Sequence, residues 1–205
     1  TAPSGNVAMA SGTDVELDIN GDGLIGFRIN EGALTSIIDN GGGIHVGNGT
    51  VILTAAGFSD AAKAVVSNSG IIEASGISKQ GGRIMLGAGP TGQVTQSGRL
   101  DVSSDTNTGG LVVIEADHIE LTAGSQIDAT GATGGGDVLV GGDWQGGNNQ
   151  ARRVFDEPNA VQQASKVSMA STASIDASAI DNGDGGTVVI WSDIDKSDSV
   201  TYVQG

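Results

Sequence analysis

Cysteine is absent from this chain of 205 residues, so neither a disulfide nor a thiolate metal ligand is available to it. Histidine occurs only at His45 and His118, far apart in the sequence. A transition-metal site is therefore disfavoured, and no cofactor is predicted. A chain without cysteine is compatible with an oxidising or a reducing compartment, so this absence does not indicate where the protein resides.

Basic residues, aromatic residues and long apolar runs are also scarce. The chain has 9 lysines and arginines against 24 acids, a formal net charge of −15, which disfavours nucleic acid and anionic membrane surfaces as partners. No apolar run reaches the length of a membrane-spanning helix, so membrane insertion is not expected. Aromatic residues make up 3% of the chain, so few exposed rings are available for carbohydrate binding. The candidates are Trp144, Phe155, Trp191 and Tyr202.

Glycine, in contrast, is abundant, and its 35 residues separate short apolar strands that repeat along the chain. Five segments share one pattern, and their central residues are 28, 28, 27 and 48 positions apart. These segments are 44–46, 72–74, 100–102, 127–129 and 175–177. A second series at 51–53, 84–86, 112–114, 138–140 and 188–190 has gaps of 33, 28, 26 and 50. The long final gap in both series indicates one insertion of about 21 residues.

This period predicts a right-handed parallel β-helix, because strands this short leave no room for a helix in the repeat. Each rung, meaning one turn of the coil, is expected to hold about 27 residues and three short strands. Equivalent residues then stack at roughly 4.8 Å, with Ile72, Leu100, Ile127 and Ile175 pointing inward. We expect residues 1–205 to form a single β-helix domain, a slice of a longer solenoid because both ends read as uncapped. Residues 144–165 are predicted to be an extra-helical insertion.

Six segments carry a family resemblance: GALTSIID, GTVILTAA, NSGIIEASG, GGRIMLGAG, GGDVLVGGDWQG and DGGTVVIWSD. They resemble the repeat or stalk region of filamentous haemagglutinin-like exoproteins, large bacterial adhesins exported by two-partner secretion. The resemblance covers nearly the whole chain from about Gly23 onward. It implies a right-handed parallel β-helix that is secreted to the bacterial cell surface or the biofilm matrix. The amino-terminal secretion domain of the family, with its own motifs, is missing by this reading, so the export route is implied by the resemblance alone.

These observations favour a non-catalytic structural and adhesive segment of a large secreted adhesin. Its partners would be flanking β-helix repeats of the same chain and a host-cell receptor or an extracellular polysaccharide. The alternative is a carbohydrate-binding or polysaccharide-degrading β-helix module. Catalysis of that kind needs carboxylates converging on one cleft, whereas the acids here are spread about one per rung, so no enzyme is expected. An ice-binding solenoid would need columns of outward threonines, which the predicted rungs lack.

The insertion supplies the candidate ligand-binding residues Trp144, Arg152, Arg153 and Phe155. Two roles are open for it, a ligand-binding loop or a cover over an apolar stripe on the outside of the coil. Soluble proteins rarely leave such a stripe exposed. The stripe is expected at Ile52, Met85, Val113, Leu139 and Val189.

Two acidic features raise the question of cation binding. Asp18, Asn20 and Asp22 resemble the opening of a calcium loop, but the twelfth position holds Ile29 in place of a bidentate carboxylate. A turn is therefore favoured there, and no metal site is assigned. The second feature is an outward column whose like charges would lie roughly 5 Å apart, either a solvated face that resists aggregation or a weak cation site. The column is expected at His45, Glu73, Asp101, Asp128 and Asp176.

Overall fold

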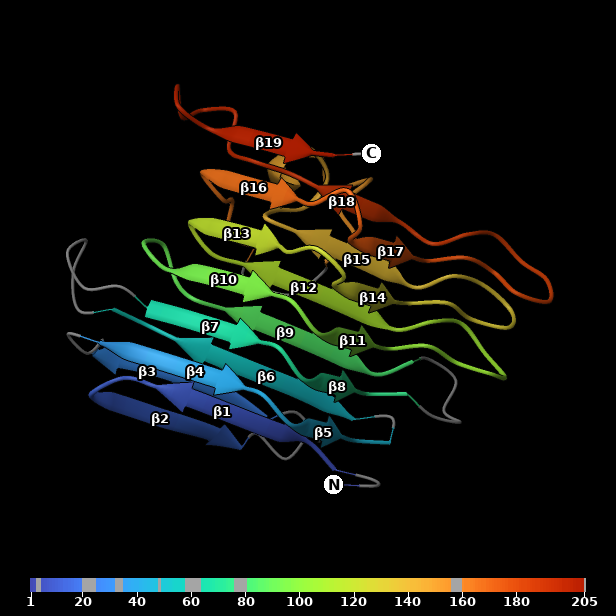
Figure 1. Ribbon diagram of the computed structural model, residues 1–205, viewed down its shortest axis with the longest axis horizontal. Coiled ribbons are helices and arrows are strands. Elements are labelled where there is room, and N and C mark those ends of the chain that lie inside the picture. The colour runs from blue at the N-terminus through green and yellow to red at the C-terminus, as the bar shows by residue number, and fades with distance from the viewer. Residues whose placement is uncertain are drawn as a thin grey trace.

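The computed structural model of the chain is an all-β structure of stacked parallel sheets (Figure 1). It describes residues 1–2, 5–19, 25–31, 35–47, 49–57, 64–75, 81–155 and 160–204. The strands rise as one stack from the blue amino-terminal end to the red carboxyl-terminal end. Within these residues the helical structure consists of the 3-10 turn η1 (Trp144–Gly147). The arrangement is consistent with the predicted β-helix.

Three parallel sheets make up the stack. From residue 36 onward, successive strands of the chain join the second, third and first sheet in turn. The first sheet contains β1 (Val7–Ser11), β6 (Thr50–Ala55), β9 (Arg83–Gly87), β12 (Leu111–Glu115), β15 (Asp137–Val140) and β18 (Val188–Ile190). The second contains β4 (Ser36–Asn40), β7 (Ala64–Asn68), β10 (Gln93–Gln96), β13 (His118–Leu121), β16 (Lys166–Met169) and β19 (Val200–Val203). The third contains β5 (Gly43–His45), β8 (Ile71–Glu73), β11 (Arg99–Asp101), β14 (Gln126–Asp128) and β17 (Ser174–Asp176).

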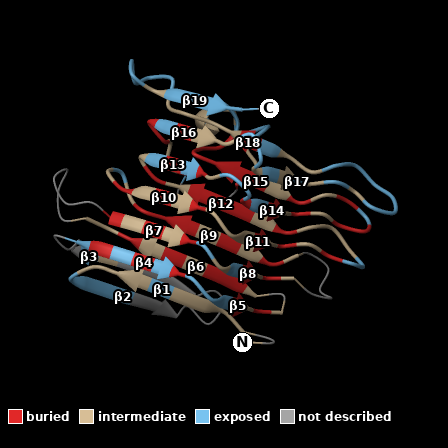
Figure 2. Ribbon diagram, viewed as in Figure 1, coloured by how far each residue is buried: buried red, intermediate tan, exposed pale blue. Residues whose placement is uncertain are grey.

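The predicted stacking of the first strand series is confirmed. Ile72 pairs in register with Leu100, Leu100 with Ile127, and Ile127 with Ile175, all in parallel. The first three side chains are buried, and Ile175 packs against the same core (Figure 2). Because side chains alternate between the two faces of a strand, one residue of each apolar–polar–apolar segment must then face outward.

A column of buried polar residues runs beside the apolar core in the second sheet. Asn40 Nδ2 donates to Asn68 Oδ1 at 2.7 Å, and Asn68 Nδ2 donates to Gln96 Oε1 at 2.9 Å. The column stops at Gln96, whose Nε2 is buried without a partner, because the next residue in register is Leu121. Since buried amides must be hydrogen-bonded to avoid a cost, this ladder fixes the register of three successive coils.

Glycine is required where the chain turns into the first sheet. A Cβ atom on Gly110 would lie 2.1 Å from the carbonyl oxygen of Gly82, and one on Gly136 would lie 2.2 Å from that of Gly110. These contacts are with the backbone of the preceding coil, which cannot move aside. The corners before β12 and β15 therefore exclude any other residue.

The amino-terminal part departs from the predicted coil. β1 joins the first sheet, but β2 (Asp14–Ile19) and β3 (Ile25–Glu31) form an antiparallel pair outside it. Ile19 pairs with Ile25, and the turn predicted at Asn20 and Asp22 lies outside the described residues. The antiparallel pair lies against β1 and β6 at the amino-terminal end of the stack.

The carboxyl-terminal end of the stack is more exposed than its middle. Its last strands belong to the edges of the three sheets, β18, β19 and β17. Val188, Val200, Tyr202 and Val203 on these strands are all exposed (Figure 2). The apolar pattern of the coil thus continues to this end without being covered within the described part of the chain.

Candidate functional site

The insertion leaves the coil after β15 and returns at β16, and its two ends are tied together. Gly141 N donates to Ile114 O at 2.8 Å, and Ala164 N donates to Gly141 O at 2.9 Å. Gly141 and Gly142 have positive φ angles of 75° and 146°, which glycine adopts without strain. The chain can therefore turn sharply away from the sheet here and come back to the next strand of the coil.

A buried carboxylate organises the first half of the insertion. Asp143 is 1% exposed, and its two oxygens accept hydrogen bonds from the backbone N–H groups of Trp144, Val154 and Phe155. The Phe155 bond is 2.9 Å long and reaches across twelve residues. Burial of an acid is tolerated only when its oxygens are satisfied in this way. Asp143 thus folds residues 144–155 into a closed loop against the coil.

The far side of this loop covers the apolar stripe. Phe155 and Val161 are 7% and 4% exposed and pack on Val113, Leu139 and Val189 of the first sheet. The predicted cover over Leu139 and Val189 is therefore observed. Full burial of each such side chain stabilises a fold by roughly 1.5 to 3 kcal/mol.

The outer side of the loop is polar and open. An open hollow of about 670 Å³ is lined by Gln145, Gly147, Asn148, Asn149, Gln150, Ala151 and Arg153. Trp144 and Arg152 do not line the hollow, but they adjoin its lining residues Gln145, Ala151 and Arg153 in the sequence. The guanidinium carbon of Arg152 lies 5.5 Å from the centre of the Trp144 ring, an arrangement that allows a cation–π interaction. Trp144 remains 39% exposed. Gln145 has a φ of 52°, the one positive φ of a non-glycine residue within the described ranges.

The four predicted ligand-binding residues therefore separate into two groups. Trp144 and Arg152 lie together on the exposed side, and Arg153 lines the hollow. Phe155 was grouped with them, but it is buried in the apolar cluster and anchors the loop, since an aromatic side chain gains most from covering aliphatic residues. Sequence reasoning missed Asp143 and the amide side chains of the hollow. The only signal for Asp143 was its place directly after the glycine pair that begins the insertion.

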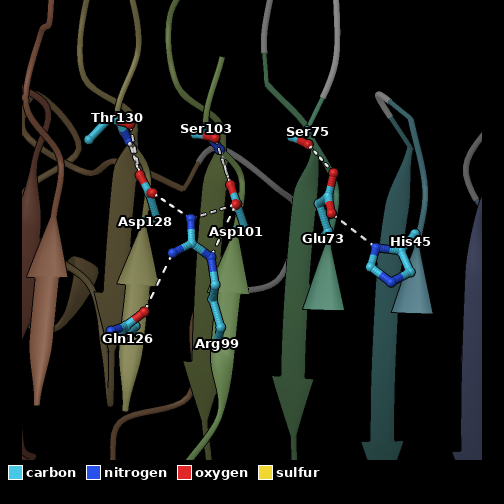
Figure 3. Close-up of polar contacts among 9 residues, drawn as sticks. All are labelled: His45, Glu73, Ser75, Arg99, Asp101, Ser103, Gln126, Asp128 and Thr130. Atoms are coloured by element: carbon cyan, nitrogen blue, oxygen red, sulfur yellow. Dashed lines mark hydrogen bonds and ion pairs between the residues drawn. The ribbon is translucent and has the colours of Figure 1, made fainter. Parts of the chain in front are cut away.

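The outward acidic column lies on the third sheet, where each acid has its own hydrogen-bond donors (Figure 3). Ser103 N and Oγ donate to Asp101 Oδ1 at 2.9 and 2.7 Å. The same pattern joins Thr130 to Asp128 and Ser178 to Asp176, so a hydroxyl residue two positions after the acid recurs from coil to coil. Such short-range turns satisfy a carboxylate without help from another segment.

Side chains of Arg99 and His45 join neighbouring coils within this column. Arg99 Nη2 lies 2.8 Å from Asp101 Oδ2 and 2.8 Å from Asp128 Oδ2, and so bridges two coils. His45 Nδ1 lies 2.9 Å from Oε2 of Glu73, which belongs to the following coil. The predicted like-charge repulsion is therefore relieved in most of the column by the residues beside it.

These contacts shift the acid strengths in the column. Hydrogen bonds from Ser75 and His45 hold the pKa of Glu73 below its ordinary value. Partial burial favours a higher pKa for Asp101, but the bonds from Ser103 and Arg99 outweigh it and lower that pKa. The hydrogen bond to Asp101 raises the pKa of Arg99. The charged forms are thus favoured, as expected for paired groups.

A metal site finds no support in the side chains that the structure describes. Within them, no group of three or more histidine, cysteine, aspartate or glutamate side chains could hold a metal ion. Asn20 and Asp22 lie outside the described residues, and Asp18 is in β2 with a side chain that the structure does not describe.

One further polar cluster resembles a nucleophile with its activating groups. The Ser165 hydroxyl donates to Asp117 Oδ1, and Lys196 Nζ donates to Ser165 Oγ at 2.8 Å. The backbone N–H groups of Ser165 and Lys166, however, both donate to the carbonyl oxygen of Asp117. They are therefore not available to stabilise an oxyanion. The cluster ties the loop before β19 to the corner before β13.

Comparison with known proteins identifies a similar fold. No protein-family model matches the chain, and no curated protein matches it. The crystal structure of the HMW1 secretion domain from Haemophilus influenzae resembles it with a TM-score of 0.68 and 21% sequence identity. The match covers 98% of this chain and 57% of that chain, so the present chain spans little more than half of its length.

The chain is an all-β protein of stacked parallel sheets, and its fold is similar to that of this solved structure. At 21% identity, the likeness concerns the fold alone. In the part of the chain that the structure describes, no helix is long and apolar enough to cross a membrane.

Proposed function

We propose that the chain is a non-catalytic structural and adhesive segment of a large exported bacterial surface protein. In this proposal it is a right-handed parallel β-helix with about 27 residues and three strands per rung, as the registers of Leu100 with Ile127 and Val66 with Val94 suggest. The observation that carries the proposal is the likeness of nearly the whole chain to a secretion domain. The resemblance to filamentous haemagglutinin-like exoproteins supports it from the sequence.

The proposed location is outside the cell, at the bacterial surface or in the extracellular matrix, after export by two-partner secretion. The proposed partners are flanking β-helix repeats of the same chain and a host-cell receptor or an extracellular polysaccharide. The exposed apolar residues on β18 and β19 support the first of these, because another coil stacked on them would bury Val188 and Val200 and pair the strand edges.

A second candidate function is that of a secretion module, the part of such a protein that directs export. The fold likeness favours it, because the solved neighbour is itself described as a secretion domain. The antiparallel pair β2–β3 at the amino-terminal end also distinguishes this chain from a uniform stalk. The sequence resemblance pointed instead to the repeat region.

One experiment separates the two candidates in the cells that make the protein. The segment corresponding to residues 1–205 is deleted from the full-length gene, and the remaining protein is measured in the culture medium and on the cell surface. Normal export with reduced attachment to host cells or matrix supports the structural and adhesive role, whereas retention inside the cell supports the secretion module. If the intact protein itself remained in the cytoplasm, both proposals would be wrong.

A carbohydrate-active module remains the alternative to an adhesive segment. The hollow on the insertion favours binding over cleavage, because the described residues that line it include amides and an arginine and no carboxylate. Release of reducing sugar from a panel of polysaccharides, measured with the purified chain, would overturn the non-catalytic proposal.

A further inference from the structure

We propose that the insertion binds a carboxylate-bearing oligosaccharide, held in the open hollow beside Trp144 and Arg152. This inference rests on the adhesive role proposed above and names a class of ligand for it. Three properties of one loop support it: its hydrogen-bond donors, its arginine and its rigidity.

The side chains of the hollow match the hydroxyl groups of a sugar. Gln145, Asn148 and Gln150 each carry two N–H donors and one carbonyl acceptor, and all three are exposed. A sugar hydroxyl both donates and accepts, so amide side chains can satisfy it from either direction. Asn149 has a different task, because its Oδ1 already accepts from Ala151 N at 3.2 Å and shapes the turn.

Trp144 and Arg152 supply what amides cannot. The indole offers an apolar face for the C–H groups of a sugar ring, and 39% of this residue is open to solvent. The Arg152 guanidinium lies over the same ring system, 5.5 Å from its centre. A planar guanidinium recognises a planar carboxylate by two parallel hydrogen bonds, which neither an amide nor a hydroxyl can do.

The charge of the loop differs from that of the whole protein. Residues 144–155 contain two arginines and no acid, in a chain with a net charge of −15. The adjoining carboxylate of Asp143 is buried and already accepts three backbone N–H groups, so it does not compete for Arg152. The two acids of the insertion, Asp156 and Glu157, follow outside the described residues. The preference for an anionic sugar therefore rests on the Arg152 guanidinium itself, whereas a long polyanion would be repelled by the rest of the surface.

The loop is also held in place before any ligand arrives. Asp143 fixes one side of it, and Phe155 fixes the other in the apolar cluster. Gly146 and Gly147 have positive φ angles of 67° and 76°, which set the tight turn that presents Gln145 and Asn148. A preorganised loop loses little conformational entropy on binding.

The test uses the intact chain, with oligogalacturonate as the probe and its methyl ester as the neutral counterpart, and isothermal titration calorimetry as the measurement. We expect the acid form to bind and the ester to bind at least tenfold more weakly. Arg152→Gln and Trp144→Ala should each weaken binding of the acid form at least tenfold. Arg99→Gln removes an arginine from the third sheet and is the matched control, which should bind as the parent does.

Thermal unfolding of each variant accompanies the titrations. Both Trp144 and Arg152 are exposed, so neither change should alter the melting temperature, and a loss of binding then reports the site itself. Equal affinity for the acid and the ester, parental affinity in both loop variants, or no binding by the parent chain would each overturn the inference. None of these outcomes affects the export experiment, so failure of this site and failure of the proposed function are distinguishable.

Discussion

Two columns of outward-facing side chains, one apolar and one acidic, are stabilised in different ways. On the first sheet, Met85, Val113 and Leu139 follow one another in register and are apolar. On the third sheet, Glu73, Asp101 and Asp128 end their strands, follow one another in register and are charged. The apolar column needs a separate segment, the insertion, to keep it from water, whereas the acids are satisfied by hydroxyl residues two positions away and by Arg99.

The difference follows from the range of the forces involved. A hydrogen bond to a carboxylate can be made by the next turn of the chain, so the acidic column can be built one coil at a time. Burial of aliphatic surface requires a second surface of similar area, which a single corner cannot provide. The first sheet therefore depends on a distant part of the chain to cover its apolar column. Met85 packs against the cluster formed with Phe155 and Val161 but is only partly buried.

The most severe test of the inside–outside assignment uses two adjacent residues of β14. Ile127 is 2% exposed, so Ile127→Asp places a carboxylate in the core, where an unpaired charge costs several kcal/mol. We expect this variant to be unfolded by circular dichroism at 25 °C. The matched change Asp128→Asn on the outward side should leave the spectrum unchanged. An Ile127→Asp variant as stable as the parent would mean that the register is wrong.

The second test removes the anchor of the cover. Phe155→Ala deletes the largest side chain of the cluster on Val113, Leu139 and Val189, and we expect a loss of about 3 kcal/mol and stronger binding of a hydrophobic dye. Urea unfolding and dye fluorescence measure the two effects. Trp144→Ala, on the exposed side of the same loop, is the control and should change neither. Unchanged dye binding in Phe155→Ala would show that the insertion does not protect the apolar column.

The third test concerns Glu115, which lies at the end of β12 under the insertion. Burial raises the pKa of Glu115 although its Oε2 accepts from Gln162 N at 3.0 Å. Since the folded state holds the proton more tightly than the unfolded state, this residue lowers stability as the pH rises through the folded pKa. Glu115→Gln keeps an acceptor and removes the charge, so we expect a gain in stability at pH 7 that disappears in acid.

Melting temperatures between pH 3 and pH 8 measure the Glu115→Gln effect, with Glu120→Gln at an exposed position of β13 as the control. A gain that stayed constant with pH would contradict the assignment to this carboxylate.

The smallest effect is expected in the acidic column. Arg99→Gln leaves Asp101 and Asp128 side by side without their shared cation, for a loss of about 0.5 kcal/mol at low salt. The lowered pKa of Asp101 means that this stabilisation is present above the ordinary pKa and is lost as the pH falls through the folded value. The gap between parent and variant should therefore close in acid and shrink in high salt, as thermal melts can measure.

Calcium provides a complementary measurement on the same column. With Arg99 in place we expect no change in the parent's melting temperature in millimolar calcium chloride, because Arg99 and the hydroxyl donors already satisfy Asp101 and Asp128. A clear rise would instead support the hypothesis of cation capture.

Much of the fold could be predicted from the sequence because its rules are local. Alternation of apolar and polar residues decides which side chain of a short strand points inward, and a repeat of that pattern aligns Leu100 with Ile127. The antiparallel pair β2–β3 was not foreseen, because Val15, Leu17 and Ile19 alternate as a strand of either orientation would. The buried ladder of Asn40, Asn68 and Gln96 was also missed, since polar residues with this spacing read equally well as surface positions.

The candidate site was only partly readable for a similar reason. Composition singled out Trp144, Arg152 and Phe155 because aromatic and basic residues are rare in this chain. It did not indicate which of these side chains face solvent. The sequence by itself determined the stacked strand series and their inward residues, because each of these depends on neighbours one strand or one repeat away. Only the tertiary structure decided that Phe155 is an anchor and Trp144 is exposed. That choice depends on Asp143 reaching the backbone of residue 155 across twelve residues, a contact that no periodic pattern encodes.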